Sequence, residues 1–324
     1  MLALPSRTEI VEVSPRDGLQ SHSRAVDTRT KIALVDALTD AGFPVIEVTA
    51  FSHPRAIPNL ADAEAVMAGI TRRPGTIYRA LAPNLRGAER AVAAQADEVL
   101  GLATLSGTYT AKNQNMTVEQ ALDQAICAFA LTQEAGRRFV MALGMSFWCP
   151  YEGTIPEADV LRAVERLHDA GVRRIYLAGS VGMEDPRHVS RLFARLVGAF
   201  PDCAFGYHVH DRAGFAPANI LAALDGGARW LEGAVCGLGG GMAMPGGERP
   251  PGNYPTEDLV HLLEASGIGT GLDLSRVIAV AERAAHLLGL QPNSHVTQWG
   301  TRASQLEAAR PRIPAFTHSG DALQ

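Results

Sequence analysis

The feature that most constrains the fold is a regular alternation of short, β-rich apolar runs with longer amphipathic segments. Such alternation is typical of parallel βαβ units. The predicted strands lie at residues 8–13, 44–49, 77–82, 97–103, 139–145, 173–178, 204–209 and 229–235. An open doubly wound sheet has roughly five or six strands and a Gly-rich first turn, and no GxGxxG pattern follows the first run. We therefore predict an α/β fold, a TIM (β/α)₈ barrel.

The helical segments and the chain length indicate one domain. Amphipathic stretches at 28–42 and 156–171 end on a glycine, which suits a left-handed helix stop. Two extra C-terminal helices are predicted at 255–266 and 274–289, before a tail rich in Gln, Arg and Pro. Because no low-complexity linker interrupts the 324 residues, we expect a single domain over 1–324, with the barrel at about 6–270 and a helical extension and tail at about 271–324.

Composition excludes several classes of protein. With 47% hydrophobic and 19% charged residues, the chain has enough apolar material for a core. A net charge of −5 without a Lys/Arg cluster argues against nucleic acid as a partner. The N-terminus lacks the pattern of a signal peptide and no segment is long enough to span a bilayer, so we expect no membrane partner and a cytoplasmic protein. The widely spaced Cys127, Cys149, Cys203 and Cys236 are expected to be reduced.

Polar residues at predicted strand ends are the candidates for chemistry, because reactive groups of such barrels lie there. Arg16 and Asp17 follow the first strand, Glu47 ends the second, and His208 and His210 end the seventh. Arg16 and Glu47 also fit a structural ion pair at the barrel rim.

His208 and His210 are two residues apart on a strand, so their rings share a face. Closure of the barrel leaves one strand between them and the first strand, which lets Asp17 meet them. Two imidazoles and a carboxylate leave positions open for substrate, as in a catalytic metal site. The alternative is a pair of hydrogen-bonded strand histidines. The metal prediction requires the three side chains to lie within about 7 Å of one another, given coordination lengths near 2 Å.

Residues around these positions are candidates for support and for closure of the site. Asp211 lies on the opposite strand face from the histidines, so we expect it to support a ligand from behind. Arg212 is placed to contact substrate. The Gly/Pro-rich segment 236–253 fits either a mobile lid or a long connection, and Asn253 at its end can reach the metal.

These residues belong to longer motifs that together resemble the 3-hydroxy-3-methylglutaryl-CoA lyase family, within the metal-dependent barrel lyases and Claisen-type enzymes. The resemblance covers about residues 6 to 290. The motifs, in order, are VEVSPRDGLQ at 11–20, VIEVTAFSHPRAIPNLAD at 45–62, APNLRGAERAVAAQADEV at 82–99, TAKNQN at 110–115, CPYEG at 149–153, HVHDRAGFAPAN at 208–219 and NYPTEDLVHLLEASGIGTG at 253–271.

The resemblance implies a function and roles for these residues. It implies a lyase that cleaves a 3-hydroxyacyl-CoA to a keto acid and the enolate of acetyl-CoA. One divalent cation, Mg²⁺ or Mn²⁺ before Co²⁺ or Zn²⁺, would be bound by the metal ligands Asp17, His208, His210 and Asn253. Arg16 would stabilise the enolate and Glu47 would support the site. The expected substrate-binding residues are Arg16, Gln20, Ser180 and Arg212, with Gly239, Gly240 and Gly241 in the loop.

The chain departs from the family pattern at three places. Gly241 stands where the family has a cysteine that resembles a proton donor, and Cys236, five residues earlier, is interpreted as a buried strand-end residue. Gly179 and Ser180 replace the acidic part of an L-G-D-T pattern, and Arg212 replaces a common threonine. These changes favour a related substrate such as citramalyl-CoA, with Arg212 binding a carboxylate in space left near Gly179.

Two alternatives stay open at this stage. One is a condensing enzyme that joins acetyl-CoA to a 2-keto acid, which the GGERPPGN stretch at 246–253 favours, although such relatives usually carry a further regulatory domain. The other is a catalytically silent barrel that binds an acyl-CoA. The sequence also leaves open whether the chain forms a homodimer.

Overall fold

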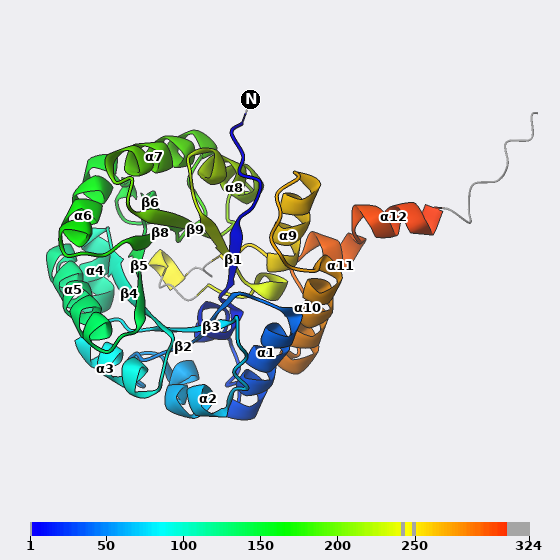
Figure 1. Ribbon diagram of the computed structural model, residues 1–324, viewed down its shortest axis with the longest axis horizontal. Helices are drawn as coiled ribbons and strands as arrows, with labels where there is room; N and C mark the ends of the chain where they lie inside the picture. Colours follow the sequence, from blue (N-terminus) through cyan, green and yellow to red (C-terminus); the bar gives the residue numbers. More distant parts are fainter. Residues whose placement is uncertain (1, 241–243, 248–250, 310–324) are drawn as a thin grey trace, which may run out of the picture.

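The described part of the chain forms a closed parallel barrel surrounded by helices (Figure 1). The computed structural model describes residues 2–240, 244–247 and 251–309. Within them the strand order around the barrel is β1-β10-β9-β8-β5-β4-β3-β2. These strands are β1 (Glu9–Glu12), β2 (Val45–Ala50), β3 (Ile77–Leu81), β4 (Glu98–Thr104), β5 (Arg138–Gly144), β8 (Arg174–Gly179), β9 (Ala204–Val209) and β10 (Trp230–Gly233). Each of the eight predicted strands is present, and the predicted barrel is confirmed.

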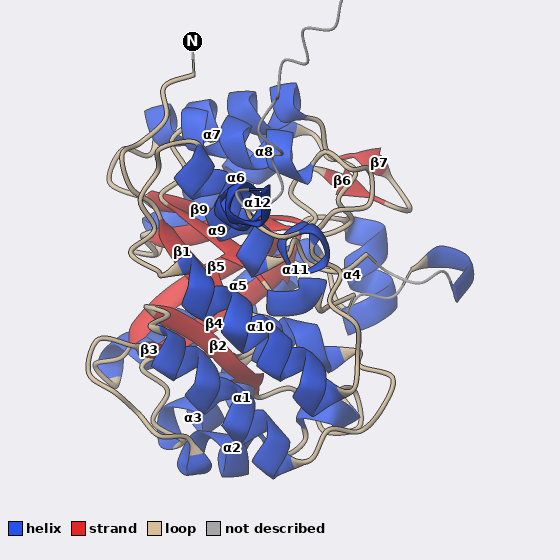
Figure 2. Ribbon diagram, turned by 90° about the vertical axis from the view of Figure 1, so that its right-hand side faces the viewer, coloured by secondary structure: helices blue, strands red, loops and turns tan. Residues whose placement is uncertain are grey.

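The helices pack outside the strands and cover the apolar core (Figure 2). They are α1 (Thr28–Ala41), α2 (Ala63–Gly69), α3 (Leu85–Ala93), α4 (Gly107–Gln114), α5 (Val118–Glu134), α6 (Glu157–Asp169), α7 (Pro186–Ala199), α8 (Ala216–Asp225), α9 (Thr256–Ala265), α10 (Leu274–Leu288), α11 (His295–Trp299) and α12 (Arg302–Ala309). The Asp27 carboxylate accepts from the backbone N of Thr30 at the start of α1, and Gly42, at φ +95°, ends it. The predicted glycine stop is therefore present.

The interior of the barrel contains buried charged side chains. Four of them have 0% exposure and lie on paired positions of the inner face, namely Glu47, Arg79, Glu98 and Glu232. Arg79 is the buried cation among them: its Nε donates to Glu98 (2.8 Å) and its Nη1 to Glu232 (2.7 Å). A buried charge is stable only when it is paired, so this network holds β3, β4 and β10 in register beneath the barrel mouth.

Three segments were not predicted from the sequence. A small hairpin, β6 (Trp148–Cys149) and β7 (Gly153–Thr154), follows β5. α4 precedes α5 between β4 and β5, and α11 and α12 follow α10, with α12 projecting from the barrel (Figure 1). These pieces are too short or too polar to show a clear apolar period. Residues 310–324, the end of the predicted Gln-, Arg- and Pro-rich tail, lie outside the described part.

Candidate active site at the barrel mouth

Arg16 and Asp17 are brought to the barrel mouth by a single π-helical turn, Ser14–Gly18, that follows β1. The carbonyl of Val13 accepts from the backbone N of both Arg16 (3.2 Å) and Asp17 (2.8 Å). Both side chains are buried, at 6% and 8% exposure, although they are adjacent in sequence.

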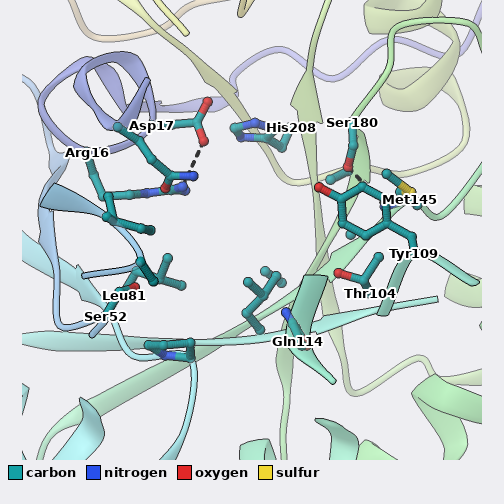
Figure 3. A pocket seen from close by; sticks show the side chains of 18 of the residues that line it. Arg16, Asp17, Ser52, Leu81, Thr104, Tyr109, Gln114, Met145, Ser180 and His208 are labelled. Carbon is teal, nitrogen blue, oxygen red and sulfur yellow. Dashed lines mark hydrogen bonds and ion pairs between the residues drawn. The ribbon is translucent and has the colours of Figure 1, made fainter. Parts of the chain in front are cut away.

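His208 and His210 project from β9 toward Asp17. β10 alone separates β9 from β1, and Figure 3 shows His208 facing the carboxylate of Asp17. The two Nε2 atoms are 3.1 Å apart, and His210 Nε2 is 4.0 Å from Asp17 Oδ2. One ligand atom of each of the three residues lies within 4.8 Å of the others, which is closer than the about 7 Å that the metal prediction requires. The group is consistent with a divalent metal site.

Asn253 completes this group from the far end of the glycine-rich segment. Its Nδ2 donates to Asp17 Oδ2 (2.7 Å) and to the Leu238 carbonyl (2.8 Å). Its Oδ1 is buried and has no hydrogen-bond partner among the described residues. An unpaired buried carbonyl oxygen is costly, and oxygen is a ligand that Mg²⁺ and Mn²⁺ accept. The unsatisfied amide therefore fits a cation bound at this place.

The electrostatics of Asp17 and His210 suit a cation. Those of His208 do not: burial would lower the pKa of His208, but the hydrogen bond to Glu232 and the charge of Asp17 raise it. Burial alone would raise the pKa of Asp17, but Arg16 and the two histidines outweigh it and hold that pKa well below its usual range. Burial, followed by the charge of His208, lowers the pKa of His210 to about 4. Metal ligands must be ionised carboxylates and neutral imidazoles, and these two residues already favour those forms.

Glu47 holds Arg16 in place. Arg16 Nε donates to Glu47 Oε1, and Arg16 Nη1 donates to Asp17 Oδ1 at 2.7 Å. Glu47 is fully buried, and burial raises its pKa despite the nearby guanidinium. The predicted ion pair is present, and it fixes the guanidinium beside the metal-binding group.

The prediction that Asp211 supports a ligand is wrong. Its Oδ1 instead accepts from the backbone N of Ala216, at 3.5 Å, where α8 begins. His208 Nδ1 contacts Glu232 Oε2 (3.1 Å), and His210 Nδ1 contacts the carbonyl of Pro251 (3.1 Å). Sequence reasoning missed Glu232, although an acidic residue inside an apolar strand was an available signal.

A cavity of about 550 Å³ opens above these side chains. Of the residues predicted from the sequence, it is lined by Arg16, Asp17, Gln20, Ser180, His208 and His210. Arg212 instead lines a separate cavity of about 220 Å³ with Trp148, Met183 and Met244.

The space expected beside Gly179 is filled. A Cβ at Gly179 would lie 1.8 Å from Oε1 of Glu184, a buried side chain that accepts from the Tyr207 hydroxyl at 2.5 Å. The prediction that Arg212 binds a carboxylate there is therefore wrong, because Glu184 occupies the volume and Arg212 lines the other cavity.

The glycine-rich segment runs beside Asn253. Gly239 and Gly240 have φ values of +135° and +106°, which glycine adopts readily. A Cβ at Gly239 would lie 2.2 Å from Asn253 Nδ2, so this close approach requires glycine. Gly241 and parts of the predicted lid, residues 241–243 and 248–250, lie outside the described residues. Cys236 is buried as predicted, and burial raises the pKa of its thiol.

Comparison with known proteins agrees with this geometry. A family model described as HMGL-like matches residues 7–283. The chain belongs to the HMGL-like family. The resemblance stated from the sequence motifs is thereby confirmed over most of the chain.

Relatives of this HMGL-like chain are carbon–carbon lyases. The mitochondrial hydroxymethylglutaryl-CoA lyase of Gallus gallus is 37% identical over 93% of this chain and 100% of its own length. The cytoplasmic 3-hydroxy-3-methylglutaryl-CoA lyase of Danio rerio is 35% identical over 91% of this chain and 87% of its own. Since these relatives lie in different compartments, the cytoplasmic location stays a prediction.

A solved structure gives the same result for the fold. An HMG-CoA lyase from Acinetobacter baumannii, in complex with coenzyme A and 3-methylmalate, superposes with a TM-score of 0.86 at 37% identity, over 93% of this chain and 98% of that one. This HMGL-like protein is therefore a hydroxymethylglutaryl-CoA-lyase-like enzyme, a carbon–carbon lyase acting on an acyl-CoA. No helix among the described residues has both the length and the apolarity that a membrane crossing requires.

Proposed function

We propose that this enzyme uses one divalent cation, Mg²⁺ or Mn²⁺, to cleave a 3-hydroxyacyl-CoA into acetyl-CoA and a keto acid. The observation that supports it best is the convergence of Asp17, His208 and His210 beside Arg16 in one buried group at the barrel mouth. Asn253, whose buried Oδ1 has no hydrogen-bond partner within the described part of the chain, is the proposed fourth ligand. A cation bound there would act as a Lewis acid that makes the substrate hydroxyl easier to deprotonate.

The residues around the proposed cation site divide the remaining work. The Arg16 guanidinium, held by Glu47, is the proposed partner of the thioester oxygen, where negative charge accumulates as the carbon–carbon bond breaks. Gln20 and Ser180 line the cavity and are proposed to hydrogen-bond the substrate. Ser180 Oγ also accepts from the backbone N of Met145 (3.0 Å), which fixes the position of its hydroxyl.

The proposed substrates are 3-hydroxy-3-methylglutaryl-CoA and close relatives such as citramalyl-CoA. Support comes from the lyase relatives and from the coenzyme A and dicarboxylate present in the A. baumannii structure. Apolar side chains line part of the cavity, among them Leu81, Leu102, Met116 and Met145, which suits a branched acyl chain.

A panel assay tests the proposal. Protein loaded with Mg²⁺ or Mn²⁺ is incubated with both thioesters, and acetyl-CoA release is measured. We expect release with at least one thioester and its loss in Asp17→Asn and His208→Ala. Absence of acetyl-CoA with both thioesters, from protein that retains stoichiometric metal, would refute the proposed reaction.

A further inference from the structure

The proposed cleavage leaves an enolate that must gain a proton at carbon, and the described residues place no thiol beside the cavity. The two buried thiols are engaged elsewhere. Cys149 Sγ donates to Ser106 Oγ (3.0 Å), and Cys236 Sγ donates to the carbonyl of Ala281 (3.0 Å). Another side chain has to supply the proton if the enzyme itself protonates the enolate.

Outside the metal-binding group, the described cavity wall offers three side chains that exchange a proton readily, His53, Tyr109 and Tyr176. These side chains carry an imidazole or a phenol. The aliphatic hydroxyl and amide side chains of the same wall ionise far less easily. His53 is exposed, and its Nδ1 accepts from the backbone N of Arg55 (3.2 Å) at the outer rim.

Tyr176 lies on the floor of the cavity. On β8 it pairs with Gly206, whereas His208 pairs with Ala178, so Tyr176 is two residues deeper in the barrel. Its ring stacks on that of His208, with centroids 5.6 Å apart and an interplanar angle of 21°. It is 3% exposed. The ring therefore supports the imidazole from below.

Tyr109 lies at the mouth, in the first turn of α4. Its backbone N donates to the Ser106 hydroxyl (3.0 Å), the side chain that caps the helix. Ser106 in turn accepts from Cys149 in the β6–β7 hairpin. Figure 3 shows the Tyr109 hydroxyl pointing into the cavity from the wall opposite Arg16.

Substrate orientation favours the mouth over the floor. The CoA portion is much larger than the acyl group and has to remain toward solvent, so the thioester carbon and the neighbouring C2 lie on the mouth side of the metal-binding group. If Arg16 contacts the thioester oxygen from one wall of the cavity, a proton donor on the opposite wall faces C2 of the substrate.

We propose that Tyr109 is the general acid that protonates the enolate, an inference that rests on the proposed function. The C3 hydroxyl first gives its proton to water in the cavity. As the C2–C3 bond then breaks, its electron pair moves to C2 and the thioester oxygen, while the C3 oxygen becomes a carbonyl. The O–H bond of Tyr109 then breaks and a C–H bond forms at C2, which gives acetyl-CoA. The phenolate left behind regains a proton from water at the mouth.

The test compares three tyrosine variants with the wild type. Tyr109→Phe removes the proposed donor, and Tyr176→Phe removes the competing phenol. Tyr151→Phe is the matched control, because its ring lies 6.3 Å from that of Tyr109 and it does not line the cavity. Each Mn²⁺-loaded protein is assayed for kcat and KM with 3-hydroxy-3-methylglutaryl-CoA and citramalyl-CoA. Mn²⁺ affinity and deuterium uptake from D₂O into the methyl group of acetyl-CoA are measured separately.

We expect Tyr109→Phe to lower kcat and deuterium uptake by about 10²- to 10⁴-fold, with KM and Mn²⁺ affinity unchanged. Tyr151→Phe should match the wild type. Wild-type kcat in Tyr109→Phe, or the same loss appearing in Tyr176→Phe alone, overturns the inference while the lyase proposal stands. Deuterium uptake that depends on Tyr109, in a protein that cleaves neither thioester, supports the inference and refutes the proposed substrates. Wild-type protein that shows neither cleavage nor uptake refutes both.

Discussion

At the scale of single residues, the buried carboxylate of Glu232 determines how His208 can act. It accepts from Arg79 (2.7 Å) and Trp230 (3.1 Å) through Oε1 and contacts His208 Nδ1 through Oε2. A proton on Nδ1 leaves Nε2 free to bind a cation. The charges of Arg79 and His208 lower the pKa of Glu232 to about 2 against the effect of burial, so the carboxylate is ionised.

Glu232→Gln is expected to weaken Mn²⁺ binding about 10- to 100-fold, because loss of a group that hydrogen-bonds to a metal-binding histidine has an effect of that size. Titration calorimetry of the metal-free protein measures it. Trp230→Phe, which removes one donor to Glu232, should give a smaller loss in the same direction. The control is Glu9→Gln, whose carboxylate pairs with Arg174 (3.1 Å) outside the cavity. Unchanged affinity in folded Glu232→Gln would contradict the role.

At the scale of elements, the start of α9 is joined to the short turn after β10, Val235–Gly237, through a buried carboxyl group. Glu257, in the first turn of α9, accepts from the backbone N of Cys236 at 3.1 and 3.2 Å. Burial raises its pKa to about 8, well above 4.5, its ordinary value. Burial thus outweighs the favourable effect of a helix N-terminus on a negative charge.

This shift predicts a pH-dependent stability. A carboxyl group whose pKa is raised on folding stabilises the protein below its unfolded pKa, and that contribution is lost as pH rises through the folded value. The contribution of Glu257 to the free energy of unfolding of the wild type should fall between pH 4.5 and about 8. Glu257→Gln, which keeps the acceptor oxygen, should lack this decline and be the more stable protein at pH 8.5.

Urea unfolding at pH 5 and pH 8.5 measures the difference. Glu264→Gln, on the exposed side of the same helix, is the control and should follow the wild type. Parallel pH curves for wild type and Glu257→Gln would show that the buried carboxyl does not titrate in this range.

At the scale of the whole molecule, the metal-binding group links distant parts of the chain. Asp17 follows β1, the histidines end β9, and Asn253 precedes α9, so a bound cation would connect the first strand to the last part of the barrel. A ligand that binds only the folded state stabilises it by mass action.

Mn²⁺ should therefore raise the melting temperature. The free energy of unfolding should increase by about 2.7 kcal/mol at a free Mn²⁺ concentration 100 times Kd. Differential scanning fluorimetry with and without EDTA measures the shift. His208→Ala should abolish it, whereas His168→Ala should retain it, although His168 belongs to a second, more exposed group with Asp202 and Cys203. An equal shift in both variants would place the stabilising cation elsewhere.

Local pattern determined the order of strands and helices, and with it which residues lie at strand ends. For this reason Arg16, Asp17, Glu47, His208 and His210 were identified from the sequence: periodicity and position in a βα unit are properties of neighbouring residues. Closure of the barrel then follows from the number of units, which is why the convergence of Asp17 with the histidines was predictable.

Only the tertiary structure decided which distant residues meet. Glu232 lies 24 residues from the histidine it supports, Glu184 fills the space beside Gly179, and Tyr109 reaches the cavity from a helix that periodicity did not reveal. Each of these contacts depends on strand register and on packing between βα units, which set side-chain positions within a few Å. A short stretch of sequence does not encode the distance from its residues to those of another unit.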